Sequence, residues 1–388
     1  MTTGCYHVYS VPLKMAVNKF EYNHSLKNVP IPDKRSYLKQ LISRYEDFIQ
    51  RLRWKAFFFL KKDSTNDRRK FDTFGFRTVK NAPQIPELIQ FESDMTTMIA
   101  NLEFREVKNK FQETLRNDIK KIKSSKSVFV QADKTHNIYQ LDKSEYGKLM
   151  HDNVTSDYKK TDNEFLRKID SEAKTITDKL KISDRVERIA LKEAYLTVKD
   201  HKPEFPNQIK ARLINPTKSN IGIISKQILE KINLELKSKL ELRLLKNTEE
   251  TIEWFKTTEN KPRRMFIQLD IVNYYPSVTA ELFDKAIKFA AENVDHEISQ
   301  TDIDIIKNAR KSILEFDGCR WTKKNEDFDI TMGAYDGAQI TDLVGLYILD
   351  KLKSEIPEID FALYRDDGLG IHKRIPTTKQ EAIKKKPV

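Results

Sequence analysis

Two apolar segments that lie far apart in the chain each lead to aspartates, and this feature limits the possible folds more than any other. The first, Met265–Val278, is an apolar run that reaches Asp270 and then enters an aromatic, proline-containing stretch. The second, Phe361–Ile371, has Asp366 and Asp367 at a tight turn between two apolar stretches. A carboxylate beside a buried strand is costly unless a cation or a hydrogen-bond donor compensates it. We therefore expect a strand and a hairpin whose acidic ends require a divalent cation.

The three aspartates are ligands of the kind that Mg²⁺ prefers, since this ion binds hard oxygen atoms. We expect Asp270, Asp366 and Asp367 to hold two Mg²⁺ ions, with Mn²⁺ as a substitute. Two ions about 3.5–4 Å apart would activate an attacking 3′-oxygen and stabilise a leaving pyrophosphate. An Asp-Asp pair in a turn is commonly a solvated surface feature, so neither segment is specific alone. Their combination, with both on predicted strands, favours a catalytic metal site.

Charge is unevenly distributed along the chain, whose 388 residues sum to +12. Residues 1–130 carry 25 Lys and Arg against 14 Asp and Glu, whereas residues 271–370 sum to −9. A basic arm and an acidic block suggest a polyanionic partner together with a cation site. The candidate contacts to nucleic acid fall in two basic clusters: Lys61, Lys62, Arg68 and Arg69, then Lys120, Lys121 and Lys123. The alternative is that these side chains form charged faces that contact only solvent.

Length and composition indicate more than one domain in an intracellular protein. Single cores seldom grow past ~250–300 residues. The two cysteines, Cys5 and Cys319, exclude a disulfide framework and fit a reducing compartment. The longest apolar runs are far shorter than the ~18–20 residues that cross a bilayer, and the N-terminus lacks the layout of a secretion signal. We expect neither secretion nor a membrane partner.

Apolar spacing predicts helices in the first part of the chain and a mixture of elements afterwards. From Asp33 onward, one helix is expected to turn an apolar stripe toward the core: Leu38, Leu41, Tyr45, Phe48 and Leu52. Strands are expected at Val128–Val130, Ile138–Leu141, Tyr195–Lys199 and Ile209–Asn215. Further helices are expected around Glu164–Leu180, Ser225–Lys246, Asp302–Leu314 and Ala338–Ile356, and from about Thr279. Because strands and helices do not alternate regularly, the class is α+β.

The residues that carry the chemistry also resemble a known family. Tyr364-Arg-Asp-Asp367 resembles the YxDD signature of reverse transcriptases, and Asp270 through Tyr275 resembles the palm motif that precedes it. The segment from Thr331 to Ala338 resembles their glycine-containing loop, and Tyr195–Lys199 with Ala211-Arg212 resembles their fingers strands. Gln131-Ala-Asp-Lys-Thr135, followed by Tyr146, is similar to a segment of Penelope-like retroelement polymerases. The resemblance covers about residues 128–375.

This resemblance implies a role for each matching position. Asp270 and Asp366 would bind the metal ions, with Asp367 as the supporting third carboxylate. Lys199 and Arg212 would contact the phosphates of an incoming nucleotide, and Gly333 would lie in the loop that supports template and nucleotide. Tyr275 would contact the sugar and exclude a 2′-hydroxyl; the alternative is that Tyr275 is a core aromatic.

The implied architecture is α+β, with the fingers and palm of a right-hand polymerase and helices backing an antiparallel palm sheet. We expect a basic helical N-terminal region at 1–126, fingers at 127–264, a palm with the catalytic aspartates at 265–375, and a basic tail at 376–388. Because 21 residues follow Asp367, we expect the chain to be truncated after the YxDD motif and to lack the thumb. We also expect the palm to expose an apolar patch where such segments would pack.

These features predict an RNA-directed DNA polymerase of a mobile element. Its expected partners are an RNA template, a DNA or RNA primer and deoxynucleoside triphosphates, with an endonuclease or a thumb segment supplied in trans. The family resemblance alone implies the nucleus, while the residues indicate only nucleus or cytoplasm. One alternative is a truncated or domesticated relic that binds nucleic acid without polymerising. A second is a DNA-directed DNA polymerase, which is disfavoured because that group splits the second acidic motif as Asp-Thr-Asp.

Overall fold

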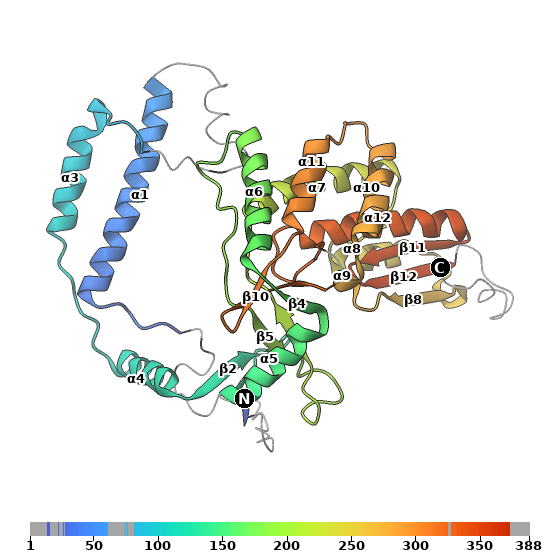
Figure 1. Cartoon of the computed structure of the whole chain (residues 1–388), viewed down its shortest axis with the longest axis horizontal. Coiled ribbons are helices and arrows are strands. Elements are labelled where there is room, and N and C mark those ends of the chain that lie inside the picture. The colour runs from blue at the N-terminus through green and yellow to red at the C-terminus, as the bar shows by residue number, and fades with distance from the viewer. Residues whose placement is uncertain are drawn as a thin grey trace. The chain divides into compact units, whose positions relative to one another are not determined.

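The computed structural model describes residues 28–60, 81–324 and 327–372, together with residues 14, 15, 22, 26, 74 and 76. The chain packs as two compact units, whose elements are labelled in Figure 1. The first unit contains Met1–Val154 and Leu196–Leu213, and the second contains Thr155–Tyr195 and Ile214–Val388. The predicted division into N-terminal region, fingers, palm and tail is a functional one and stays a prediction.

Helices make up the N-terminal part of the first unit: α1 (Lys34–Leu60), the 3₁₀ helix η3 (Pro86–Leu88), α3 (Ile89–Ala100) and α4 (Lys110–Ser124). Helices α1 and α3 lie side by side (Figure 1), and the Tyr45 hydroxyl donates to the Glu92 carbonyl at 3.0 Å. The predicted helix is confirmed, but its stripe does not face a core. Phe48 is 41% exposed, whereas Ile49 is buried. Because α3 covers only a narrow side of α1, most of the stripe stays half-buried.

Two small sheets complete the first unit. β2 (Ser127–Gln131) and β3 (Ile138–Asp142) pair antiparallel, and β1 (Lys14–Met15) pairs with the other edge of β3. A separate sheet joins β5 (Tyr195–Val198) to β6 (Ala211–Ile214). Val198 of β5 is buried in one cluster with Val130, Tyr139 and Leu141. The four strands expected in this part of the chain are confirmed, with slightly different bounds.

A four-stranded sheet lies in the second unit, in the order β7-β11-β12-β8. Its strands are β7 (Arg243–Leu244), β8 (Phe266–Asp270), β11 (Ile359–Tyr364) and β12 (Asp367–His372). β11 and β12 form the expected hairpin, β8 pairs antiparallel with β12, and β7 runs parallel to β11. Along β8, Ile267 and Leu269 pack against the core, while Phe266, Gln268 and Asp270 are exposed. This alternation is the pattern of a strand with one buried face.

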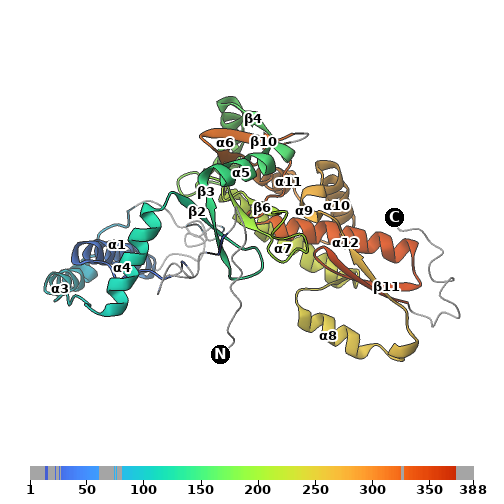
Figure 2. The same ribbon diagram turned by 90° about the horizontal axis from the view of Figure 1, so that it is seen from below.

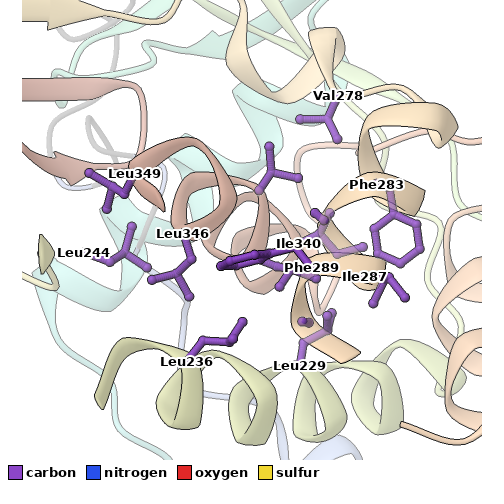
Figure 3. Packing of buried hydrophobic residues seen from close by; sticks show 14 of the residues in the cluster. Leu229, Leu236, Leu244, Val278, Phe283, Ile287, Phe289, Ile340, Leu346 and Leu349 are labelled. Atoms are coloured by element: carbon purple, nitrogen blue, oxygen red, sulfur yellow. The ribbon is translucent and has the colours of Figure 1, made fainter. Parts of the chain in front are cut away.

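One helix packs on this sheet, and two further helices of the second unit pack on that helix. Helix α12 (Gly337–Glu355) packs on β11, and α7 (Ile221–Lys239) and α10 (Ala280–Asn293) pack on α12. Figure 2 shows α12 running alongside β11. In the core between them, Leu229 and Leu236 of α7 point toward Leu346 of α12 and Phe289 of α10 (Figure 3). The chain therefore has mixed helices and mainly antiparallel sheets, as the α+β class predicts.

The remaining elements are α5 (Lys143–Asp157), β4 (Tyr158–Thr161), α6 (Asn163–Lys179), α8 (Thr248–Thr257), η4 (Lys261–Arg263), α9 (Tyr274–Ser277), α11 (Gln300–Ala309), β9 (Leu314–Phe316) and β10 (Cys319–Lys323). The sequence boundary between the units, after Val154, falls within α5. The order β4-β10-β9 forms an antiparallel sheet.

Two helices end earlier than the sequence predicts. α7 stops at Lys239, because Glu241 adopts a left-handed backbone with φ of 51° and the chain then enters β7. α11 stops at Ala309, and β9 begins at Leu314. Within the described ranges, no helix has both the length and the apolar character needed to cross a membrane.

Candidate active site

Two of the three predicted metal ligands lie opposite each other. Strand register pairs Asp270, the last residue of β8, with Asp367, the first residue of β12. The Ile271 N–H donates to the Asp366 carbonyl at 2.8 Å, so Asp366 is held beside the same strand end. The structure thus brings the two acidic segments together at one end of the sheet, as predicted.

All three aspartates are exposed, and within the described ranges no side chain forms an ion pair with them. In the same ranges, no group of three or more His, Cys, Asp or Glu side chains is arranged to hold a metal ion. Mg²⁺ usually binds through one or two carboxylates, completed by water and substrate phosphates. Asp270 and Asp367 fit that description, since they are adjacent hard-oxygen ligands without a compensating cation. Metal binding by Asp270, Asp366 and Asp367 stays a prediction.

The turn between β11 and β12 is fixed to helix α12 by Arg365. This residue has a left-handed backbone with φ of 57°, which is uncommon for a residue other than glycine. Its guanidinium donates to the Ala338 carbonyl at 2.9 Å and forms an ion pair with Asp342. Burial raises the pKa of Asp342, although the neighbouring guanidinium lowers it. The sequence alone indicates no role for Arg365, because its partners Ala338 and Asp342 lie on another segment.

Two glycines allow β12 to pass between its neighbours. A Cβ on Gly368 would lie 2.9 Å from Leu363 Cδ2 and 3.0 Å from Leu269 Cβ. A Cβ on Gly370 would lie 2.9 Å from Ile359 Cγ2. Because side chains from β11 and β8 fill these places, glycine is needed to keep the acidic strand ends in register.

The tyrosine pair after Asp270 divides into a buried and a half-buried ring. Tyr274 is buried, and its hydroxyl donates to the Thr341 carbonyl of α12 at 2.6 Å. Burial raises the pKa of Tyr274 above its ordinary value. Tyr275 is half-buried, with its ring edge-to-face with that of Tyr274 and 6.3 Å away between centroids. Tyr274 therefore takes the core position, and contact of Tyr275 with a sugar stays a prediction.

The glycine-containing loop packs against the segment that follows β6. Gly333 has a φ of 111°, and a Cβ there would lie 3.0 Å from the Asn215 carbonyl oxygen. Asn215 is itself fixed, because its side-chain amide donates to the Ile313 carbonyl at 3.0 Å. Glycine is thus required at 333 by both its backbone angle and the close carbonyl.

A buried ion pair supports the end of this loop. Asp336, just before α12, accepts hydrogen bonds from the Arg310 guanidinium and, at 2.5 Å, from the Ser225 hydroxyl of α7. The side chains of Arg310 and Asp336 are 1% and 0% exposed. Burial raises the pKa of Asp336, while the guanidinium and the hydroxyl lower it. Sequence reasoning missed this group, whose three members come from separate segments.

The predicted phosphate ligands lie in the first unit, on the β5–β6 sheet. Lys199 follows β5, and its N–H donates to the Lys210 carbonyl at 2.9 Å. Arg212 on β6 donates to the Asp133 carboxylate at 2.7 Å, and the side chain of Asp133 is 7% exposed. Burial lowers the pKa of Lys199, and the nearby Arg212 guanidinium lowers it further. Asp133 belongs to the segment 131–135, and the sequence alone indicates no role for it.

The basic side chains predicted to contact nucleic acid are only partly described. Lys120, Lys121 and Lys123 are exposed on α4, and Lys121 and Lys123 lie in its last turn, where a helix favours cations. Lys121 also forms an ion pair with the buried Asp118, at 3.7 Å. Lys61, Lys62, Arg68 and Arg69, like the 376–388 tail, lie outside the described residues.

Apolar side chains are exposed near the free edge of β8. The rings of Phe255 on α8 and Phe266 on β8 lie 5.5 Å apart, and they are 41% and 37% exposed. Val272, just beyond Asp270, is also exposed. That a patch on the palm receives a further segment stays a prediction.

Neither a protein-family model nor a curated protein sequence matches this chain significantly. Similar solved structures include apo telomerase from Candida tropicalis, with a TM-score of 0.48 and 9% identity, covering 82% of this chain and 59% of that one. Telomerase from Candida albicans in complex with a TWJ fragment of telomeric RNA has a TM-score of 0.44 and 11% identity, covering 69% and 50%. The RNA-dependent RNA polymerase of a human picorbirnavirus has a TM-score of 0.38 and 13% identity, covering 75% and 61%.

The chain thus spans between half and three fifths of the telomerase chains. Because the sequence identities are 13% or lower and the TM-scores are below 0.5, the function is inferred from the residues of this chain.

Proposed function

We propose that this chain catalyses template-directed nucleotidyl transfer, and more narrowly RNA-directed DNA synthesis as part of a retroelement reverse transcriptase of the Penelope-like type. The observation that carries the proposal is the register of Asp270 opposite Asp367, with Asp366 beside them. Like charges directly opposite each other destabilise a sheet. Cation binding would account for two carboxylates placed directly opposite each other, whereas a purely structural role would not.

The chain's own residues would divide the work between binding and positioning. Bound Mg²⁺ would supply charge neutralisation at the attacking oxygen and the leaving pyrophosphate. Arg212 and Lys199 would hold the triphosphate, since a guanidinium and an ammonium both bind phosphate oxygens well. Tyr275 would lie against the sugar, and the loop at Gly333 would support the template. Catalysis would come from alignment and electrostatics, with no covalent intermediate.

Positioning in the second unit would depend on helix α12. Arg365 ties the acidic turn to this helix, and Tyr274 ties the segment after Asp270 to it. Both acidic segments therefore share one rigid support. Small misplacements are costly in reactions that depend on alignment.

A second candidate function is nucleic-acid binding without polymerisation. It is favoured by the exposed lysines at the end of α4 and by the lack, among the described residues, of a preformed three-ligand metal site. Phosphate contacts need no catalytic centre. Only the first candidate function requires the carboxylates of Asp270, Asp366 and Asp367.

Primer extension separates the two candidates. The full chain would be incubated with Mg²⁺, deoxynucleotides and a primed poly-ribonucleotide template, beside Asp366→Asn and the matched control Asp360→Asn. We expect extension by the parent and the control, and none by Asp366→Asn, with template affinity kept within a few-fold. Binding without extension by the parent chain would instead support the second candidate. A poly-deoxyribonucleotide template in parallel tests the RNA-directed part of the proposal.

A further inference from the structure

A cavity in the second unit lies beside the glycine-containing loop and away from the three aspartates. Its volume is about 40 Å³, and its lining includes Arg188, Lys218, Arg310, Lys311 and Asp336. One water molecule needs ~10–15 Å³ on the same measure. The cavity therefore admits a group larger than a single water.

Arg310 is a buried cation with unused hydrogen-bond donors on the wall of this cavity. Its side chain is 1% exposed and forms its ion pair with Asp336 through Nη2. Its Nε and Nη1 are buried and have no hydrogen-bond partner among the described residues. Buried donors of a guanidinium are costly to leave unpaired, and such exceptions call for a ligand or water. A ligand that fills this role must carry acceptor oxygens, since a guanidinium only donates.

The cavity lining also carries an uncompensated positive charge. Three of its four cations have carboxylate partners: Arg188 with Asp170, Arg310 with Asp336, and Lys311 with Glu172. Lys218 has no carboxylate partner among the described residues, and its Nζ lies 4.5 Å from the centre of the Tyr335 ring. Tyr335 is 38% exposed, so this side of the cavity is accessible to solvent. These three pairs leave the lining with an excess of one positive charge.

We infer that this cavity binds a phosphate group, with Lys218 supplying the attraction and Arg310 the buried donors. Water could accept hydrogen bonds from the buried donors, but it would leave the positive charge uncompensated. A phosphate oxyanion would accept these hydrogen bonds and would also neutralise the charge. The hydroxyl of Ser219, also in the lining, adds a polar group suited to an oxyanion. The phosphate has two possible sources, the backbone of a nucleic-acid strand or free inorganic phosphate. The inference goes beyond polymerase activity and does not depend on it.

Calorimetric titration of the full chain with inorganic phosphate, at constant ionic strength, tests the inference. The parent is compared with Lys218→Gln and with Lys226→Gln, an exposed lysine of α7 that is absent from the cavity lining. We expect saturable binding that Lys218→Gln weakens about tenfold or more, since bonds to charged groups are the stronger kind. Lys226→Gln removes the same charge and is expected to leave the affinity within about twofold of the parent.

A second variant tests the buried donors. Arg310→Lys keeps a positive charge beside Asp336 and removes Nε and Nη1, so we expect phosphate affinity to fall while the thermal unfolding curve stays cooperative. If Arg310→Lys does not fold, the comparison of the two lysine variants decides. Absence of saturable phosphate binding, or equal losses in Lys218→Gln and Lys226→Gln, would overturn the inference.

Competition with an oligoribonucleotide identifies the source of the phosphate. If phosphate displaces the oligonucleotide and Lys218→Gln weakens both ligands, the site binds a strand phosphate. If Lys218→Gln weakens phosphate alone, the site binds the free ion. Either result supports a phosphate site.

Discussion

Asp270 and Asp367 are cross-strand partners, placed directly opposite each other where β8 and β12 meet. In such pairs the Cβ atoms lie about 4.5–5.5 Å apart, and like charges there are unfavourable. The surrounding structure nevertheless holds both in place, through the glycines of β12 and the contact of Arg365 with α12. We propose that a bound cation offsets this repulsion between the two carboxylates.

For Arg212 we expect a role in binding the incoming nucleotide. Arg212→Ala should raise the KM for nucleotide about tenfold or more, because a charge-assisted hydrogen bond contributes ~1.5–3 kcal/mol. Template affinity should change less. Steady-state kinetics with varied nucleotide concentration measures this, and Lys210→Ala, which removes an exposed neighbouring cation paired with Glu204, is the control. An unchanged nucleotide KM together with lost template binding would place Arg212 in contact with the template.

Tyr275 is expected to discriminate between sugars. Tyr275→Val should admit ribonucleotides far more readily than the parent, because the ring would no longer exclude a 2′-hydroxyl. Tyr347→Val changes another half-buried tyrosine, on α12, and should leave the ratio of deoxynucleotide to ribonucleotide incorporation unchanged. Measurement of kcat/KM for both nucleotide types gives the ratio. The same ratio in an active Tyr275→Val variant would return Tyr275 to a core role.

Removal of the Arg365 side chain should destabilise the chain in a pH-dependent manner. In Arg365→Met, Asp342 loses its partner, and burial already raises the pKa of Asp342. A raised pKa in the folded state means that stability is lost as pH rises from the unfolded value of about 3.9. We therefore expect Arg365→Met to cost ~1–3 kcal/mol near neutral pH and less near pH ~4.

Urea unfolding at the two pH values, with Asp342→Asn and the double variant, completes a thermodynamic cycle for this pair. At neutral pH the double variant should lose less stability than Arg365→Met alone, because the amide carries no charge for burial to penalise. Equal losses for Arg365→Met at both pH values would show that Asp342 is not the group responsible.

Gly368 is predicted to be essential for the register of the acidic strands. Gly368→Ala places a methyl group 2.9 Å from Leu363 Cδ2 and 3.0 Å from Leu269 Cβ, so we expect ~1–3 kcal/mol of overpacking cost. Gly147→Ala is the matched control, since nothing lies within 4 Å of its added methyl group. In α5 that control should be neutral or stabilise the chain by ~0.5–1 kcal/mol. Chemical unfolding measures both, and equal stabilities would contradict the packing of β12.

Local patterns in the sequence predicted the acidic strand ends. The apolar run that ends at Asp270 and the turn at Asp366-Asp367 depend on neighbours in the chain, and the structure has both a strand and a hairpin there. The stripe on α1 shows the limit of such patterns, because periodicity predicts a helix but not how much of it another element covers. Phe48 is exposed for that reason.

The groups that sequence reasoning missed all depend on tertiary contacts. Arg365 meets Ala338, Arg310 meets Asp336, and Arg212 meets Asp133, in each case between separate segments. Nothing in one segment specifies the charge that will lie opposite it. Arg365, Asp336 and Asp133 lie within segments that carry the family resemblance, but their partners become visible only in the folded chain.

Metal binding by the paired aspartates tests the central claim most directly. Titration of the full chain with Mn²⁺, followed by electron paramagnetic resonance of the free ion, gives the affinity without any need for activity. We expect Asp270→Asn and Asp367→Asn each to weaken Mn²⁺ binding about tenfold or more, because an amide keeps the shape and loses the charge. Asp360→Asn, on β11 and paired with Arg243, should bind as the parent does. Equal Mn²⁺ affinity in all four proteins would contradict the assignment of Asp270 and Asp367 as a cation site.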